Sequence, residues 1–204
     1  MDFATIPYGR IRRELVEPFY PTRSAAWLEI PAGSEGASLG PASNHYYEVG
    51  NPSGGLCAIR TAFDISIHNY EQVSLLIDGF HVTNSGMSPG IGIKDTASTR
   101  GVSIWTPANA ETATYRAFGS GVPDQTVPYG WGGAEATRRR NLGLVIRPKS
   151  REVLLVMDDQ VIWSRAEPNL QLGVVRFVFD STQASGVTTG KIRLAQFRVL
   201  LEHN

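Results

Sequence analysis

Two short clusters of aromatic residues are the parts of this sequence best suited to binding a ligand. Tyr129 and Trp131 lie in a stretch rich in glycine, and His45, Tyr46 and Tyr47 follow one another directly. Aromatic rings with a polar edge stack on sugar rings and are common at partner contacts. We therefore predict that a carbohydrate, if one binds, contacts these five residues.

The sequence shows no pattern typical of a metal or cofactor site. The histidines are His45, His68, His81 and His203, and none has a metal-ligand spacing to another suitable residue. There is no Asp-x-Asp-x-Asp calcium loop, no nucleophile elbow and no phosphate-binding loop. We expect no catalytic residue, no cofactor and no bound metal.

Charge and composition narrow the range of partners. The 204 residues carry 19 basic and 19 acidic groups, so the formal net charge is zero. A neutral chain offers no electrostatic attraction to nucleic acid or to an anionic membrane, and the run 138–140 is too short to change this. The N-terminus lacks a signal-peptide pattern, and no run of 18 apolar residues occurs. Cys57, the single cysteine, rules out an intrachain disulfide.

Short alternating or apolar runs between turn residues dominate the chain from residue 25 onward. They are 25–30, 45–49, 59–67, 73–82, 91–93, 102–105, 113–118, 142–147, 152–157, 160–163, 174–179 and 191–201. This pattern predicts an all-β, two-sheet antiparallel sandwich with less than about a tenth of its residues in helix. Trp27, Trp105 and Trp163 fall inside strand patterns and are expected in the core. The stretches 31–43 and 119–137 do not show a strand pattern.

Residues 1–24 are interpreted as an N-terminal arm, and residues 25–204 as the sandwich domain. Pro7 and Pro18 bracket a segment that fits a short helix or an extended strap. The arm is apolar for a segment outside the sandwich. Such an arm can pack on its own domain or on a neighbouring subunit. We predict that it crosses to a neighbouring subunit and holds a homo-oligomer together. The proposed assembly contacts are Ile11, Leu15, Phe19 and Tyr20.

The last third of the chain has a characteristic order of strands. A strand ends at 146–148, a hairpin turns at Asp158 and Asp159, and apolar strands follow at 174–179 and 192–200. This order resembles the C-terminal half of concanavalin A-like and laminin-G-like jelly-roll sandwiches. The resemblance covers about residues 56–201. It implies a jelly roll of the kind found in lectins, glycosidases, adhesion modules and the minor tail or baseplate proteins of tailed bacteriophages.

Two functional classes follow from this resemblance. The glucanase branch of the fold carries its carboxylates as Glu-x-Asp-x-x-Glu on one strand, and this motif is absent here. Asp78, Asp158 and Asp159 are better interpreted as bend or turn residues. The first hypothesis is therefore a non-enzymatic structural protein of a phage tail, located in the virion, with possible contact to a host cell-surface glycan. The alternative is a free-standing lectin-like carbohydrate-binding module or a divergent glycoside hydrolase.

Overall fold

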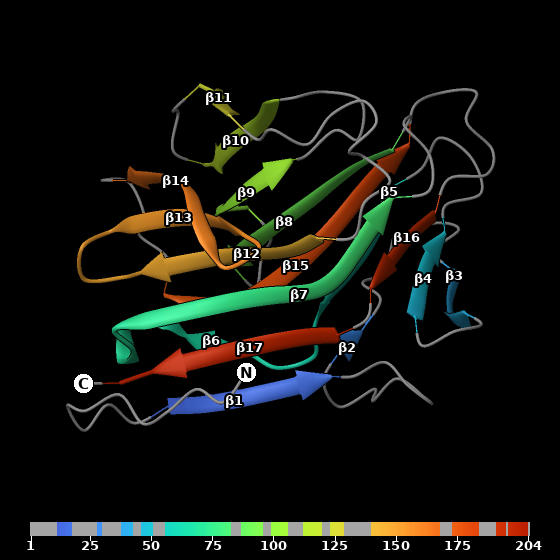
Figure 1. Cartoon of the computed structure of the whole chain (residues 1–204). Helices are drawn as coiled ribbons and strands as arrows, with labels where there is room; N and C mark the ends of the chain where they lie inside the picture. Colours follow the sequence, from blue (N-terminus) through green and yellow to red (C-terminus); the bar gives the residue numbers. More distant parts are fainter. Residues whose placement is uncertain are drawn as a thin grey trace.

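The part of the chain described by the computed structural model is almost entirely β. It comprises residues 12–17, 28–29, 38–42, 46–50, 56–82, 87–95, 99–105, 112–119, 123–128, 140–167, 173–183, 191–194 and 196–203. These residues form seventeen strands and one 3-10 turn, η1 (Ile67–Asn69), with no α-helix among them. All the strand pairs recorded are antiparallel, and the strands form two sheets that lie one in front of the other (Figure 1). The predicted fold class is confirmed.

The nine-stranded sheet has the order β14-β13-β12-β7-β16-β4-β3, and β17 pairs with both β7 and β1. Its strands are β1 (Arg12–Glu17), β3 (Ser38–Ala42), β4 (Tyr46–Gly50), β7 (Gln72–Val82), β12 (Arg140–Arg147), β13 (Glu152–Met157), β14 (Gln160–Ala166), β16 (Lys191–Leu194) and β17 (Gln196–Glu202). The long strand β7 is central, since it pairs with β12, β16 and β17.

The eight-stranded sheet has the order β11-β10-β9-β8-β15-β5-β2, and β6 pairs with β15. Its strands are β2 (Leu28–Glu29), β5 (Leu56–Thr61), β6 (Ile65–Ser66), β8 (Met87–Asp95), β9 (Gly101–Trp105), β10 (Thr112–Phe118), β11 (Gln125–Pro128) and β15 (Val174–Gln183). Neighbours in this sheet include strands far apart in sequence, such as β15 and β5.

The core lies between the two sheets, and alternating residues of β7, β8, β12 and β17 belong to it. Leu75 on β7 and Leu144 on β12 face Ile93 on β8 and Phe177 on β15, and all four are fully buried in one cluster. Because successive side chains of a strand point to opposite faces, this alternation decides which residues remain for the outer faces. Trp163 packs against the cluster as expected.

The hairpin between β13 and β14 forms where the sequence predicts it. Asp158 and Asp159 both have positive φ, 49° and 66°, which is the conformation of a tight type I′ hairpin turn. Gly79, within the long strand β7 and next to Asp78, also has a positive φ of 62°. Asp158 and Asp159 connect β13 to β14 at one end of the nine-stranded sheet.

Two sequence interpretations need correction at the edges of the sheets. The stretches 31–43 and 119–137, which lack a strand pattern, contain the short strands β3 and β11. Each pairs on one side only, and each contains a proline, Pro41 or Pro128. Proline is tolerated on an edge strand because one side of that strand makes no ladder hydrogen bonds.

Part of the N-terminal arm is a strand of the sandwich rather than a helix. Residues 12–17 form β1, which pairs antiparallel with β17, and Leu15 lies opposite Val199. The side chain of Leu15 packs against the core of its own chain. The other proposed assembly contacts, Ile11, Phe19 and Tyr20, lie outside the described residues, and the oligomer stays a prediction.

Candidate functional site

The outer face of the eight-stranded sheet carries an unusual arrangement on β8 and β9. The core residues of these strands alternate with Gly90 and Gly92 on β8 and with Ser103 and Trp105 on β9. Gly90 pairs with Trp105, and Gly92 pairs with Ser103. The two glycines therefore lie beside an aromatic and a hydroxyl side chain on a face that points away from the core.

Trp105 lies against the backbone of β8. A Cβ atom added to Gly90 would lie 2.8 to 3.0 Å from three atoms of the indole, Cδ2, Cε2 and Cε3. Such similar distances place the ring's face, and not its edge, over this glycine. The indole nitrogen donates a hydrogen bond of 3.0 Å to Ser103 Oγ, which fixes the ring in its plane. The sequence prediction that Trp105 belongs to the core is wrong, and Trp27 lies outside the described residues.

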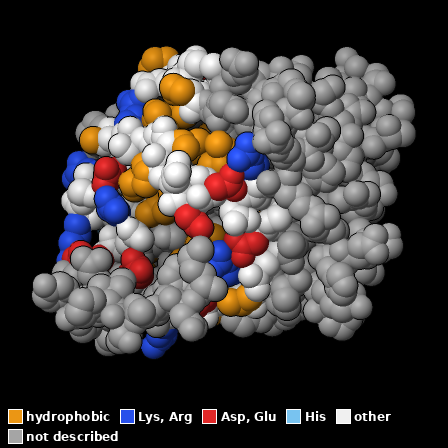
Figure 2. All heavy atoms as spheres, viewed as in Figure 1, with side chains coloured by type: hydrophobic (Ala, Val, Ile, Leu, Met, Phe, Trp, Pro, Cys, Tyr) orange, Lys and Arg blue, Asp and Glu red, His pale blue; other side chains and the backbone are white. Residues whose placement is uncertain are grey.

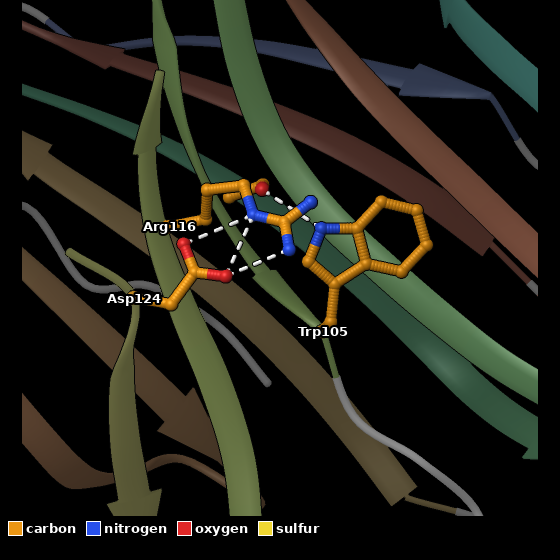
Figure 3. Close-up of polar contacts among 4 residues, drawn as sticks. Trp105, Arg116 and Asp124 are labelled. Atoms are coloured by element: carbon orange, nitrogen blue, oxygen red, sulfur yellow. Dashed lines mark hydrogen bonds and ion pairs between the residues drawn. The ribbon is translucent and has the colours of Figure 1, made fainter. Parts of the chain in front are cut away.

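An ion pair on the same face joins β10 to the residue that precedes β11. Arg116 on β10 pairs in register with Ser103, and its Nε donates to both carboxylate oxygens of Asp124 at 3.0 Å, while Nη2 donates to Oδ2 at 2.7 Å. Figure 3 shows this pair beside Trp105 and its hydrogen bond. Both charged side chains are about half exposed, at 45% and 43%.

The ion pair fixes the charge of both partners. The hydrogen bond from Arg116 lowers the pKa of Asp124 below its ordinary value of 3.8. The same hydrogen bond raises the pKa of Arg116. The carboxylate is therefore ionised at neutral pH, and it accepts hydrogen bonds while the guanidinium donates them.

These residues together have the chemistry that a sugar ring requires. A flat aromatic ring can stack on the apolar face of a pyranose, as indoles do with other apolar groups. A guanidinium and a carboxylate beside it can donate to and accept from neighbouring hydroxyls. The sequence contains one signal for this site. Val102 and Ile104 alternate with Ser103 and Trp105, so if the first two face the core, the other two face outward.

Most of the predicted carbohydrate site lies outside the described residues. Tyr129, Trp131 and His45 are not among the described residues. Tyr46 and Tyr47 belong to β4, which lies in the nine-stranded sheet, paired with β3 and β16. They are therefore on a different sheet from Trp105. Nothing described brings the two predicted clusters together, and their role stays a prediction.

The described residues contain neither a metal-ligand cluster nor a membrane-spanning helix. No group of three or more His, Cys, Asp or Glu side chains within these ranges could hold a metal ion. No helix in the same part of the chain is long and apolar enough to cross a membrane.

Comparisons with known proteins add a clear structural likeness. No protein-family model and no curated protein matches the sequence. Among solved structures, a β-glucanase of Bacillus licheniformis superposes with a TM-score of 0.63 at 12% identity, covering 94% of this chain and 98% of that one. SCLam, a non-specific endo-β-1,3(4)-glucanase from family GH16, gives 0.64 at 10%, covering 96% and 92%. The carbohydrate recognition domain of Emp46p gives 0.62 at 9%, covering 85% and 88%.

These structures correct the functional prediction. The similar solved structures are mostly glycoside hydrolases, with some lectins, and a non-enzymatic phage-tail role, with its virion location, finds no support among them. The prediction relied on the absence of one linear motif. That absence excludes little, because strand pairing can bring polar groups together from separate strands, as it does for Arg116 and Asp124. The likeness shows the fold, a concanavalin A-like and lectin-like jelly-roll sandwich.

Proposed function

We propose that this chain is a carbohydrate-active protein that binds a polysaccharide on the outer face of its eight-stranded sheet. Trp105, whose ring lies over Gly90, is the observation that carries the proposal. The indole stacks on one sugar ring, and the Arg116–Asp124 pair forms hydrogen bonds with hydroxyl groups of the same or the next ring. The charges of Arg116 and Asp124 cancel, and this favours a polysaccharide without charge.

Binding to soluble polysaccharides and to a glycan array tests this proposal. Trp105→Ala should weaken binding about tenfold or more, since stacking on an aromatic face contributes on the order of 1 kcal/mol beyond the buried area. Trp105→Phe should lose less. The matched control is Val161→Ala, on the outer side of β14 at 57% exposure, which should bind as the parent does. Equal affinities of the Trp105→Ala variant and the parent protein would overturn the proposal.

Hydrolysis of the bound polysaccharide is a second candidate function, and the glucanases of the same fold favour it. Glycoside hydrolysis uses two carboxyl groups, one of them ionised. Asp124 is suited to the ionised role, because Arg116 holds its pKa below the ordinary value. A second carboxyl group facing the same sugar would serve as the acid.

Release of reducing sugar from β-1,3- and β-1,4-linked glucans tests the hydrolytic candidate. We expect the parent protein and Glu152→Gln, which lies on the opposite sheet, to release sugar steadily, and Asp124→Asn to release none. This result would support hydrolysis with Asp124 as a catalytic residue. Binding without release from any glucan that binds would reject hydrolysis and leave the binding proposal standing. The two functions are therefore separable by measuring binding and sugar release on the same glucans.

A further inference from the structure

A second site lies on the outer face of the other sheet. A pocket of about 510 Å³ opens there where β1, β17, β7 and β12 lie side by side. Its lining residues are Glu14, Val16, Asp78, Asn141, Asp159, Gln196 and Arg198. Figure 2 shows acidic and basic side chains gathered next to an apolar area on this face. The pocket belongs to a different sheet from Trp105, so it is independent of the proposed polysaccharide site.

Arg198 organises one wall of the pocket. Its Nη2 lies 2.8 Å from Asp78 Oδ1, and its Nη1 lies 3.6 Å from Glu14 Oε1. The guanidinium side chain is 16% exposed. The pairing of β17 with both β1 and β7 brings these three charges together. They therefore hold their positions without a ligand.

The opposite wall is formed where the ladder between β12 and β7 shifts register near Asn141. Asn141 Oδ1 accepts a hydrogen bond of 3.1 Å from the backbone N–H of Gly79, and the backbone N–H of Asn141 donates one of 2.9 Å to Asp158 Oδ1. Asp158 is also paired with Arg140. The neighbouring carboxylate of Asp159 is exposed at the hairpin turn and lines the pocket.

The charge of the lining is strongly one-sided. The lining has three carboxylates and one guanidinium, which give a formal charge of −2; they belong to Glu14, Asp78, Asp159 and Arg198. Such a site repels anions and attracts a cation. The adjacent Arg140–Asp158 pair adds no net charge.

Aliphatic side chains adjoin this negative pocket. Val16 is 37% exposed and forms part of its lining. Half-buried Leu76 and Val156 line a smaller hollow, which shares with the pocket Asp78, Asn141, Asp159 and Arg198. Lysine and arginine side chains place an aliphatic stem against apolar surface and a cationic end in a polar site. An aliphatic wall does not stabilise a small hydrated cation, so these side chains favour a ligand with an apolar part.

We propose that this pocket is a docking site for a partner polypeptide, and that it takes a lysine or arginine side chain flanked by apolar residues. The cationic end lies among Glu14, Asp78 and Asp159, and the stem packs on Val16. With the polysaccharide face on the opposite sheet, both ligands can bind at the same time.

Fluorescence anisotropy with short peptides tests the proposal on the full chain. The probe is a labelled, acetylated and amidated peptide Gly-Val-Lys-Leu-Gly, and its control carries norleucine in place of lysine. We expect the lysine peptide to bind at least about tenfold more tightly than the norleucine peptide, and added salt to weaken it. Asp159→Asn should weaken binding about fivefold, because asparagine tolerates the positive φ at this turn while the charge is lost.

The matched control is Glu152→Gln. Glu152 lies on the same sheet and is paired with Arg147 outside the pocket, so this variant loses one negative charge elsewhere and should bind the lysine peptide as the parent does. Equal binding of both peptides, or an Asp159→Asn variant that binds like the parent, would overturn the proposal. So would binding of spermidine or of a glucosamine oligomer with no binding of the lysine peptide. Self-association that Asp159→Asn abolishes, seen by light scattering, would assign the pocket to a second copy instead and overturn it too.

Discussion

At the level of single residues, Trp105 and Gly90 depend on each other. The indole lies where a side chain on Gly90 would be, and Ser103 fixes its ring plane by accepting a hydrogen bond from the indole nitrogen. A glycine on one strand therefore determines how an aromatic residue on the next strand is presented. The same face carries the bidentate Arg116–Asp124 pair, which holds donors and acceptors in fixed directions.

Gly90→Ala should displace the indole and destabilise the sandwich. The new Cβ would lie 2.8 Å from the ring, and overpacking of this kind costs about 1–3 kcal/mol. Gly173→Ala is the matched control, because a Cβ there meets nothing within 4 Å. Urea denaturation measures both variants, and polysaccharide binding should fall in Gly90→Ala only. Two equal denaturation midpoints would contradict the proposed packing of Trp105.

The Arg116–Asp124 pair predicts a pH dependence. The folded-state pKa of Asp124 lies below 3.8 because Arg116 donates hydrogen bonds to its carboxylate. The pair therefore contributes fully above pH 3.8, and its contribution is lost as the pH falls through the lowered pKa. A carboxyl carbon NMR titration should give Asp124 a midpoint below 3.8, and Arg116→Gln should return it toward that value. An unchanged midpoint in Arg116→Gln would show that the pair does not persist in solution.

At the level of secondary-structure elements, β1 matters because it forms one edge of the nine-stranded sheet. It pairs with β17 over its six residues, and Leu15 faces the core while Val16 faces outward. An edge strand that covers another strand also protects that strand from pairing with a second molecule. This packing within the chain is compatible with the predicted oligomer but does not test it.

Leu15→Ala and Val16→Ala distinguish the two sides of β1. Leu15 is half-buried against the core, so its truncation should lower the free energy of unfolding by about 1–2 kcal/mol, less than for a fully buried leucine. Val16 is 37% exposed, and its truncation should change stability by no more than about 0.5 kcal/mol. Chemical denaturation of both variants checks the order, and equal effects would contradict the observed direction of Leu15.

At the level of the whole molecule, a buried polar contact joins the two sheets. Tyr115 on β10 donates a hydrogen bond of 3.1 Å to Glu167 Oε2, just after β14 of the other sheet. Glu167 is 1% exposed, and Arg165 Nε lies 3.5 Å from the same oxygen. Burial, together with the nearby Glu167 carboxylate, raises the pKa of Tyr115 above its ordinary value of 10.0. A buried carboxylate is tolerated here because it has both partners.

Tyr115→Phe should cost about 1–3 kcal/mol, since it removes a donor from a buried carboxylate. Tyr70→Phe is the control, at a half-buried tyrosine whose ring lies tilted against that of His203. The raised pKa adds a second signature. The parent protein should lose stability as the pH rises above 10.0, where an unfolded tyrosine ionises and Tyr115 does not. The difference in free energy of unfolding between the parent protein and Tyr115→Phe should therefore decrease above that pH. A difference that stays constant with pH would contradict the prediction.

The sequence by itself determined the fold class, most of the strands and the Asp158–Asp159 hairpin. These depend on local signals, namely period-2 alternation and turn residues, that are present in any stretch of chain. It did not determine the edge strands β3 and β11, which carry proline and small residues and are held by pairing with a neighbour. Nor did it indicate the two candidate sites. Trp105 needs Gly90 on another strand, and the −2 pocket needs β1, β7, β12 and β17, which are separated by up to the length of the chain. Such sites depend on strand pairing between distant segments, which only the tertiary structure decides.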